Sequence, residues 1–204
     1  NKSPFSLSVP EIDHTNMRAL RITAHNEIAF YQYKRLSSAR YIVRTDISRF
    51  FPSIYTHALP WSYHGKTASK EDTSYKSAEV YFNRLDLILR QSQDGQTVGI
   101  AVGPDASRVI AEIIATAIDR EFQRRIDRTP MMIRHVDDIW IGARSRDEAD
   151  HLLNTYRECL REFELDINEL KTSIVDAPNA LSPYWPKDFG SQIQAQFERG
   201  FVYG

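Results

Sequence analysis

The chain has 204 residues, with 26 Lys and Arg against 27 Asp and Glu and a formal net charge of −1. This length supports one hydrophobic core with a smaller attached lobe, and the single cysteine, Cys159, excludes an internal disulfide. The sequence contains no signal peptide and no apolar run of transmembrane length, so we expect a cytoplasmic protein with no membrane partner. The near-neutral charge is not typical of a nucleic-acid-binding domain, although arginines cluster over 120–128.

The first predicted strand carries an aspartate. The chain begins irregularly, and a helix is predicted over 16–37. A run of β-forming residues follows over 41–51 and contains Asp46. The next segment, 52–80, is rich in turn-forming residues and is interpreted as an insertion, and a helix is predicted over 81–90.

A glycine-punctuated loop, Gly95–Pro104, leads into a helix whose apolar residues recur at helical spacing. Gly99 and Gly103 would let the backbone approach a flat or polyanionic ligand closely. The N-terminus of the helix would offer unpaired N–H donors to an anion. The alternative is an ordinary turn into a helix, with no ligand.

Two adjacent aspartates, Asp137 and Asp138, lie in the middle of the β-rich run 131–141. This run predicts two short strands joined by a tight turn with both carboxylates at its tip. Two such charges repel, and a divalent cation would remove the conflict, because hard oxygen ligands favour Mg²⁺ or Mn²⁺. The alternative is an ordinary Asp-rich turn, since Asp is common in turns.

Asp46 on the earlier strand favours the metal site. An intervening helix can bring that strand beside the hairpin, so that three carboxylates from two neighbouring strands meet. Such a set suits a two-metal phosphoryl-transfer site, with ions roughly 3.5–4 Å apart.

The last long helix is predicted to begin at Ser145, which forms a capping-box pattern with Glu148. Its apolar stripe includes Cys159, which is therefore expected to be buried and inert. The segment 165–172 follows this helix.

Four segments, in this order, resemble the motifs of a reverse transcriptase palm. They are Asp46–Phe51 (Asp followed by an aromatic residue), Gly99–Ser107 (with Gly103 four positions before Ser107), His135–Asp138 (the Tyr-x-Asp-Asp box) and Leu165–Thr172 (Asn followed by Lys-Thr). A narrower resemblance is to bacterial abortive-infection and defence-associated reverse transcriptases. It rests on Gly99–Pro104, Ser107–Arg108, Ala111–Glu112, Pro60–Trp61 and His64–Lys66.

The resemblance implies an α+β fold, namely a ferredoxin-like polymerase palm whose antiparallel sheet carries helices on one face, plus partial fingers. We expect partial fingers over 1–40 and the palm over 41–176, with the insertion over 52–80. Residues 177–204 are expected to begin a C-terminal connection or thumb that is truncated in this chain.

The resemblance also implies roles for individual residues. Asp46, Asp137 and Asp138 would be catalytic metal ligands together with the Ile47 carbonyl, and Lys171 would stabilise or protonate the departing pyrophosphate. Nucleotide-binding roles are implied for Ile47, Phe50, Phe51, Arg18, Arg21, Val102, Gly103 and Ser107. The alternatives are surface roles for the arginines and Lys171, a core role for the rings and helix capping by Ser107.

Two departures from the family pattern bear on templating. Val102 stands where related enzymes carry a glutamine that touches the incoming nucleotide, and His135 replaces the tyrosine that supports the primer end. Both leave metal binding unchanged and imply looser copying of a template.

We therefore expect an RNA-directed or template-independent DNA polymerase acting in bacterial anti-phage defence. Its partners would be deoxynucleoside triphosphates, an RNA or DNA template and primer or a protein primer, and further copies of itself in a homo-oligomer. A palm-fold nucleotide cyclase is the second enzyme considered, although its Gly-Gly-Asp-Glu-Phe hairpin is absent. The non-enzymatic alternative is a catalytically inactive palm that serves as a scaffold for RNA binding or oligomerisation.

Overall fold

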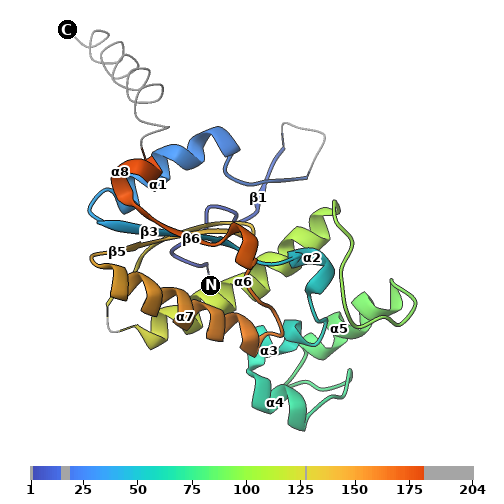
Figure 1. Ribbon diagram of the computed structural model, residues 1–204. Coiled ribbons are helices and arrows are strands. Elements are labelled where there is room, and N and C mark those ends of the chain that lie inside the picture. Colours follow the sequence, from blue (N-terminus) through green and yellow to red (C-terminus); the bar gives the residue numbers. More distant parts are fainter. Residues whose placement is uncertain (1, 15–18, 127, 182–204) are drawn as a thin grey trace, which may run out of the picture.

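The structure is a computed structural model that describes residues 2–14, 19–126 and 128–181 (Figure 1). Its strands are β1 (Glu11–Ile12), β2 (Leu20–Arg21), β3 (Tyr41–Asp46), β4 (Met131–His135), β5 (Asp138–Ala143) and β6 (Ser173–Asp176). Its α-helices are α1 (Ile28–Leu36), α2 (Phe50–Ser53), α3 (Ala58–His64), α4 (Lys66–Glu71), α5 (Phe82–Gln91), α6 (Asp105–Arg125), α7 (Arg146–Glu162) and α8 (Ala177–Leu181). Two short 3-10 helices are η1 (His25–Glu27) and η2 (Glu169–Lys171).

Four strands form one antiparallel sheet in the order β4-β5-β3-β6. Successive side chains of a strand point to opposite faces, and here both faces are apolar. Along β3, Ile42 packs into one hydrophobic cluster and the next residue, Val43, packs into the other. The antiparallel palm sheet predicted from the sequence is confirmed.

Helices cover both faces of this sheet (Figure 1). The long helices α6 and α7 lie on the face of Val43, whereas α1 and α8 lie on the face of Ile42. The prediction placed helices on one face only. The second layer forms because Ile42, Ile133 and Trp140 make the other face apolar as well.

The N-terminal segment covers the free edge of β4. The Leu7 N–H donates to the Arg134 carbonyl at 2.8 Å, and the Arg134 N–H donates to the Phe5 carbonyl at 3.0 Å. These bonds satisfy backbone groups that an edge strand would otherwise leave open. They also connect the start of the chain to the strand that precedes the two aspartates.

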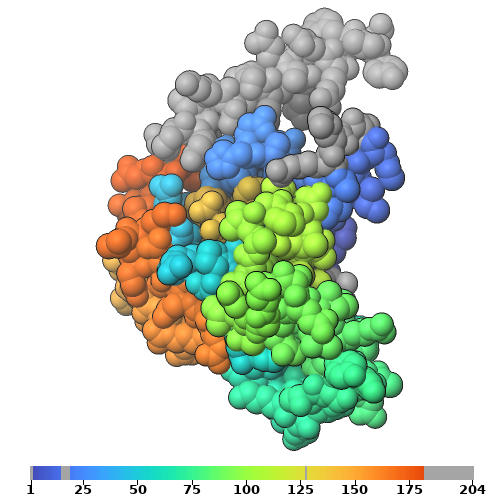
Figure 2. All heavy atoms as spheres, turned by 90° about the vertical axis from the view of Figure 1, so that its right-hand side faces the viewer, coloured from blue at the N-terminus to red at the C-terminus, as the bar shows by residue number. Residues whose placement is uncertain are grey.

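The segment between β3 and α6 projects as a lobe, seen as the teal and green atoms at the lower end of Figure 2. The predicted turn-rich insertion contains two helices, α3 and α4, and the predicted helix over 81–90 is α5. The usual burial pattern of an amphipathic helix is reversed in part of α5. The charged Asp86 is buried, while the apolar Leu85 and Ile88 are 43% and 52% exposed. Asp86 is held inside by His57, whose Nδ1 atom lies 2.8 Å from its carboxylate.

One of the two bonds of the predicted capping box of α7 forms, whereas the Glu148 carboxylate accepts from the Arg144 N–H instead of the Ser145 N–H. The Ser145 hydroxyl accepts a hydrogen bond from the Glu148 N–H at 3.1 Å. Cys159 is buried on the apolar face of this helix, and burial raises the pKa of its thiol to about 12, so the thiol is inert at neutral pH. Over the described ranges, no helix combines the length and the apolarity that spanning a membrane requires.

Candidate active site

Three aspartates come together at one end of the two central strands. Asp46 is the last residue of β3 and Asp138 is the first residue of β5, and the antiparallel register pairs them directly. Asp137 lies in the turn before β5, where its carbonyl accepts a hydrogen bond from the Ile47 N–H at 3.1 Å. Directly paired residues have Cβ atoms roughly 4.5–5.5 Å apart, so the register brings two carboxylates together.

The turn that carries Asp137 has an unusual backbone. It consists of Val136 and Asp137, and Val136 has a φ of 57°. A positive φ at only the first of two turn residues is the pattern of a type II′ turn, where glycine usually stands. For a β-branched residue this conformation costs about 1–3 kcal/mol, so surrounding contacts must maintain it.

Arg134, fully buried on β4, anchors the strand that leads into this turn. Its guanidinium contacts the two carboxylate oxygens of Glu112 at 2.9 and 3.0 Å and one oxygen of Asp119 at 2.9 Å, both on α6. It also donates to the Val136 carbonyl at 3.1 Å. Removing one partner of a buried ion pair costs about 3–5 kcal/mol, so α6, β4 and the turn form one connected unit.

The two oxygens of the Asp46 carboxylate have different surroundings. Asp46 is only 4% exposed. Its Oδ2 atom pairs with the exposed ammonium of Lys171, and its Oδ1 atom is buried without a hydrogen-bond partner. The hydrogen bond to Asp46 raises the pKa of Lys171, which keeps its ammonium charged at neutral pH. A buried oxygen without a partner is unfavourable, and a cation beside Oδ1 would relieve this.

The surroundings of Asp137 disfavour its charged form. Burial raises the pKa of its carboxyl group, and the nearby charges of Asp138 and Asp46 raise it further. A backbone hydrogen bond and Lys171 act in the opposite direction, but the net direction is upward. The cluster is therefore short of positive charge.

The three carboxylates fit a divalent cation in charge and in ligand type. Across the residues described by the structure, no three His, Cys, Asp or Glu side chains are grouped closely enough to hold a metal ion. The donors are nevertheless hard oxygens, of the kind that Mg²⁺ and Mn²⁺ prefer. The partnerless Oδ1 atom of Asp46 is available as a ligand.

Lys171 is positioned by the segment 165–172, which runs beside the end of β3. The Asn168 N–H donates to the Asp46 carbonyl at 2.9 Å. The Asn168 side-chain oxygen then accepts from the Leu170 N–H at 3.2 Å, which turns the chain back. The structure thus brings Lys171 to the predicted catalytic carboxylates, and its role toward pyrophosphate stays a prediction.

A small hollow lies between the turn, α2 and α6. It has a volume of about 20 Å³ and is lined by Ser8, Ile22, Phe50, Phe51, Arg108, Ala111, Glu112 and Val136. Phe50 is 2% exposed and belongs to the core, whereas Phe51 is partly buried. One water needs about 10–15 Å³ of such space, so a nucleotide can enter only if a wall moves. Nucleotide binding by either ring stays a prediction.

The glycine loop packs against the protein itself. Gly99 has a φ of 89°, and a Cβ atom there would lie 3.1 Å from the Pro52 carbonyl oxygen. This contact explains the glycine without a ligand. Gly103 has open space around it, and Val102 is 72% exposed, so this end of the loop is accessible. Ser107 is buried in the first turn of α6.

Of the two fingers arginines predicted to bind the nucleotide, the structure describes one. Arg18 lies outside the described residues, and Arg21 on β2 pairs with Glu11 of β1 at 3.2 Å. Arg21 must leave this carboxylate if it is to bind a triphosphate. His135, the residue in the position of the family's tyrosine, has its Nε2 atom 3.1 Å from the Thr23 carbonyl, so its ring is tied to the N-terminal part of the chain.

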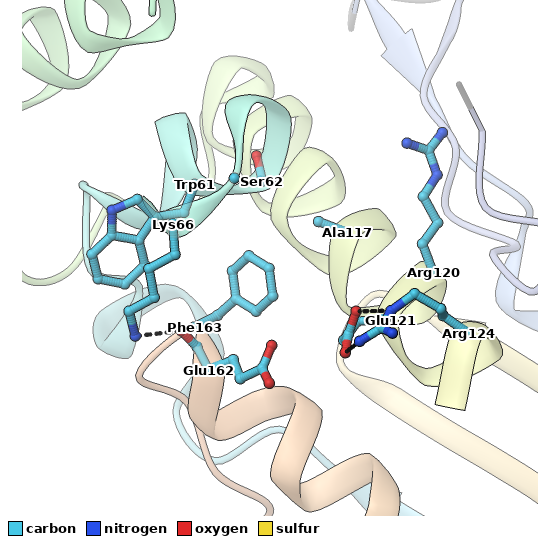
Figure 3. A pocket seen from close by; sticks show the side chains of 10 residues that line it. Trp61, Ser62, Lys66, Ala117, Arg120, Glu121, Arg124, Glu162 and Phe163 are labelled. Atoms are coloured by element: carbon cyan, nitrogen blue, oxygen red, sulfur yellow. Dashed lines mark hydrogen bonds and ion pairs between the residues drawn. The ribbon is translucent and has the colours of Figure 1, made fainter. Parts of the chain in front are cut away.

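The arginine cluster of α6 is largely neutralised. Arg124 and Arg125 contact the carboxylate of Glu121 at 2.6 and 2.7 Å. Figure 3 shows Arg124 and Glu121 at one side of a hollow of about 370 Å³, in which Lys66 donates to the Glu162 carbonyl at 2.9 Å. Because its charges are mostly paired, this hollow offers little to a phosphate.

Three residues of the site were not predicted from the sequence, namely Ser8, Arg108 and Arg134. Arg108 lines the small hollow and directly follows Ser107 of the predicted loop motif. Arg134 lies one residue before the predicted box, which is a signal that could have found it. Ser8 comes from an irregular segment that carries no such signal.

Most of the chain matches the sequence model of a known protein family. The reverse transcriptase (RNA-dependent DNA polymerase) family matches residues 5–188. The chain therefore belongs to this family. A search of curated proteins gave no match.

Solved telomerase structures share the fold. The telomerase of Candida albicans, in complex with a fragment of telomeric RNA, is 12% identical with a TM-score of 0.51, over 76% of this chain and 30% of that one. Apo telomerase from Candida tropicalis is 13% identical with a TM-score of 0.53, over 76% of this chain and 33% of that one. The chain thus spans about a third of the length of these telomerase chains.

Proposed function

We propose that this chain carries the polymerase centre of a reverse transcriptase and joins deoxynucleotides by metal-dependent phosphoryl transfer. The proposal rests on the direct pairing of Asp46 with Asp138, beside Asp137, in a member of this family. The raised pKa of Asp137 and the partnerless oxygen of Asp46 support a cation at this place.

In this mechanism, Asp46, Asp137 and Asp138 would hold divalent cations, with the Ile47 carbonyl as a further ligand. Such cations, Mg²⁺ or Mn²⁺, lower the pKa of an attacking hydroxyl and steady the leaving pyrophosphate. The Lys171 ammonium, charged and exposed beside Asp46, can neutralise the pyrophosphate or give it a proton.

The nucleotide would lie against Phe51, where the chain follows the family motif. An aromatic ring beneath the sugar leaves no room for a 2′ hydroxyl, which favours deoxynucleotides. Arg108, which lines the same hollow and has no ion pair among the described residues, would face the phosphates. Arg18, Arg21, Gly103 and Ser107 remain proposed contacts of the nucleotide.

The template and the biological role are proposed from the narrower resemblance. Primer and template would be RNA or DNA, or a protein hydroxyl would prime synthesis. The segments that resemble abortive-infection and defence-associated reverse transcriptases, Gly99–Pro104 and Ser107–Arg108 among them, support a role in bacterial anti-phage defence.

Incorporation of labelled deoxynucleotides with Mg²⁺ tests the proposal. Asp137→Asn removes a charge with little change in volume, and we expect a loss of at least about a hundredfold in rate. Asp150→Asn is the matched control, because its side chain is 53% exposed on α7. Equal rates for wild type and Asp137→Asn would contradict the assignment. RNA binding without any incorporation would instead support an inactive scaffold.

A further inference from the structure

The backbone of Val136 is held from two sides. Its N–H donates to the hydroxyl of Ser8, and its carbonyl accepts from Arg134 at 3.1 Å. Ser8 is 4% exposed and Arg134 is fully buried, so water competes little for either bond. Both bonds converge on the one residue of the turn that has a positive φ at a β-branched side chain.

Neither of these two groups moves easily. Arg134 is fixed by the carboxylates of Glu112 and Asp119 on α6. Ser8 follows Leu7, whose N–H donates to the Arg134 carbonyl at 2.8 Å, so the N-terminal segment is attached to the same residue. The two contacts on Val136 therefore belong to one rigid assembly.

The orientation of Asp137 depends on this turn. Its carbonyl accepts from the Ile47 N–H at 3.1 Å, next to Asp46, so the turn is connected to the adjacent strand on its far side. If Val136 relaxed to a negative φ, the following peptide would rotate and the Asp137 carboxylate would move relative to Asp46.

We propose that Ser8 and Arg134 are positioning residues that hold Val136 in its positive-φ conformation and so keep Asp137 aligned with Asp46. The proposal rests on the proposed polymerase function for its effect on rate. It assigns the N-terminal segment a part in the reaction, in addition to covering the edge of β4.

The test uses Ser8→Ala, which removes one acceptor and leaves the ion pairs of Arg134 intact. We expect the incorporation rate at saturating nucleotide to fall by about tenfold, because the Asp137 carboxylate is displaced from Asp46. Ser69→Ala is the matched control. Ser69 is also 4% exposed and loses one hydrogen bond, to the Gly65 carbonyl, on α4.

A second variant separates positioning from simple stability. Glycine adopts positive φ freely, so in a Val136→Gly background the Ser8 hydroxyl is no longer needed to hold the turn. Ser8→Ala should then change the rate by less than about twofold, a non-additive result typical of coupled residues. The same tenfold loss in both backgrounds would overturn the proposal.

Hydrogen exchange at the Val136 amide tests the proposal without activity. In Ser8→Ala this amide should exchange about tenfold faster than in wild type or Ser69→Ala, because its bond is lost while the sheet stays folded. Unchanged exchange would overturn the positioning role. A separate outcome is that wild type incorporates no nucleotide while the Val136 amide still exchanges faster in Ser8→Ala. In that case the polymerase assignment is wrong, but the stabilisation of the Val136 conformation by Ser8 is confirmed.

Discussion

The Lys171 ammonium pairs with one oxygen of Asp46, while the other oxygen of that carboxylate is buried without a hydrogen-bond partner. A divalent cation that binds Asp46 therefore meets a positive charge already in place. Like charges repel, so metal binding and the Lys171–Asp46 pair oppose each other. One side chain can thus influence both metal affinity and chemistry.

Replacing Lys171 by Met should separate these two effects. Without the ammonium, we expect the Mg²⁺ concentration for half-maximal incorporation to fall by about threefold. The rate at saturating Mg²⁺ should fall by about a hundredfold, because a general acid is lost. Metal titrations of the initial rate measure both, with Lys171→Arg as the charge-preserving control. An unchanged metal requirement would contradict the opposition between Lys171 and the cation.

Asp137 should make the metal-free protein less stable at neutral pH. Its folded-state pKa lies above the ordinary value of 3.8, so the folded state disfavours the charged form. This destabilisation is fully present above the folded pKa, declines as pH falls through it and is absent below 3.8. Asp137→Asn should therefore have the higher melting temperature in EDTA at pH 7, with a difference that shrinks on acidification.

Thermal unfolding of wild type and Asp137→Asn between neutral and acidic pH measures this difference. Mg²⁺ should raise the melting temperature of wild type more than that of the variant, since it binds the folded carboxylates. A difference that stays constant over the whole pH range would show that another effect of the substitution is responsible.

Gly99 should tolerate a side chain less well than Gly95. Both have a positive φ, which costs an alanine about 1–2 kcal/mol, but only at Gly99 would a Cβ atom meet backbone, at 3.1 Å from the Pro52 carbonyl oxygen. Gly99→Ala should thus lower the free energy of unfolding more than Gly95→Ala, as measured by urea titration. Equal losses would mean that the contact with Pro52 relaxes freely.

The catalytic strands could be predicted from the sequence because their signal is local. Asp46 and Asp137 each lie in or beside a run of β-forming residues, and such a run predicts a strand from its own composition. Burial of Arg134 could not be predicted in this way. A charged residue in a strand is usually exposed, and its partners Glu112 and Asp119 lie on a preceding helix, where only the tertiary fold brings them close.

The same limit applies to α5 and to the second helical layer. Leu85 and Ile88 predict a helix correctly, but a hydrophobic pattern alone would turn them inward. The contacts of Asp86 with His57 and Arg90 turn the helix the other way. Likewise, the adjacent apolar residues Ile42 and Val43 point to opposite faces of the strand, so the sequence indicates that both faces are apolar. It does not indicate which helices cover each face.

Phe51 is expected to discriminate between sugars. Its ring is only partly buried beside the hollow, so Phe51→Ala should remove a wall without opening the core as Phe50→Ala would. We expect ribonucleotide use to rise at least about tenfold relative to deoxynucleotide use. Competition assays with matched nucleotide pairs measure the ratio, and Phe51→Tyr, which keeps the ring, should leave it low. An unmoved ratio in Phe51→Ala would place the steric gate elsewhere.

Val102 is expected to loosen the dependence on a template. Its side chain is 72% exposed at the open end of the glycine loop and has no donor or acceptor, so it cannot hold a nucleotide in register by hydrogen bonds. Stacking tolerates any base, because every base has a π-face. The protein, freed of bound nucleic acid by nuclease, should therefore make DNA from four deoxynucleotides and Mg²⁺ without copying an added template.

Val102→Gln should increase the share of product DNA that is copied from the template, relative to DNA made without one. The exposed position makes a stability change beyond about 0.5 kcal/mol unexpected, so a change in the product can be attributed to the amide. Sequencing the DNA made by wild type, Val102→Gln and the apolar control Val102→Leu measures the fraction complementary to the template, which should rise only with glutamine. A faithful complement made by wild type itself would show that base pairing in a firmly held template suffices and that Val102 does not set the fidelity.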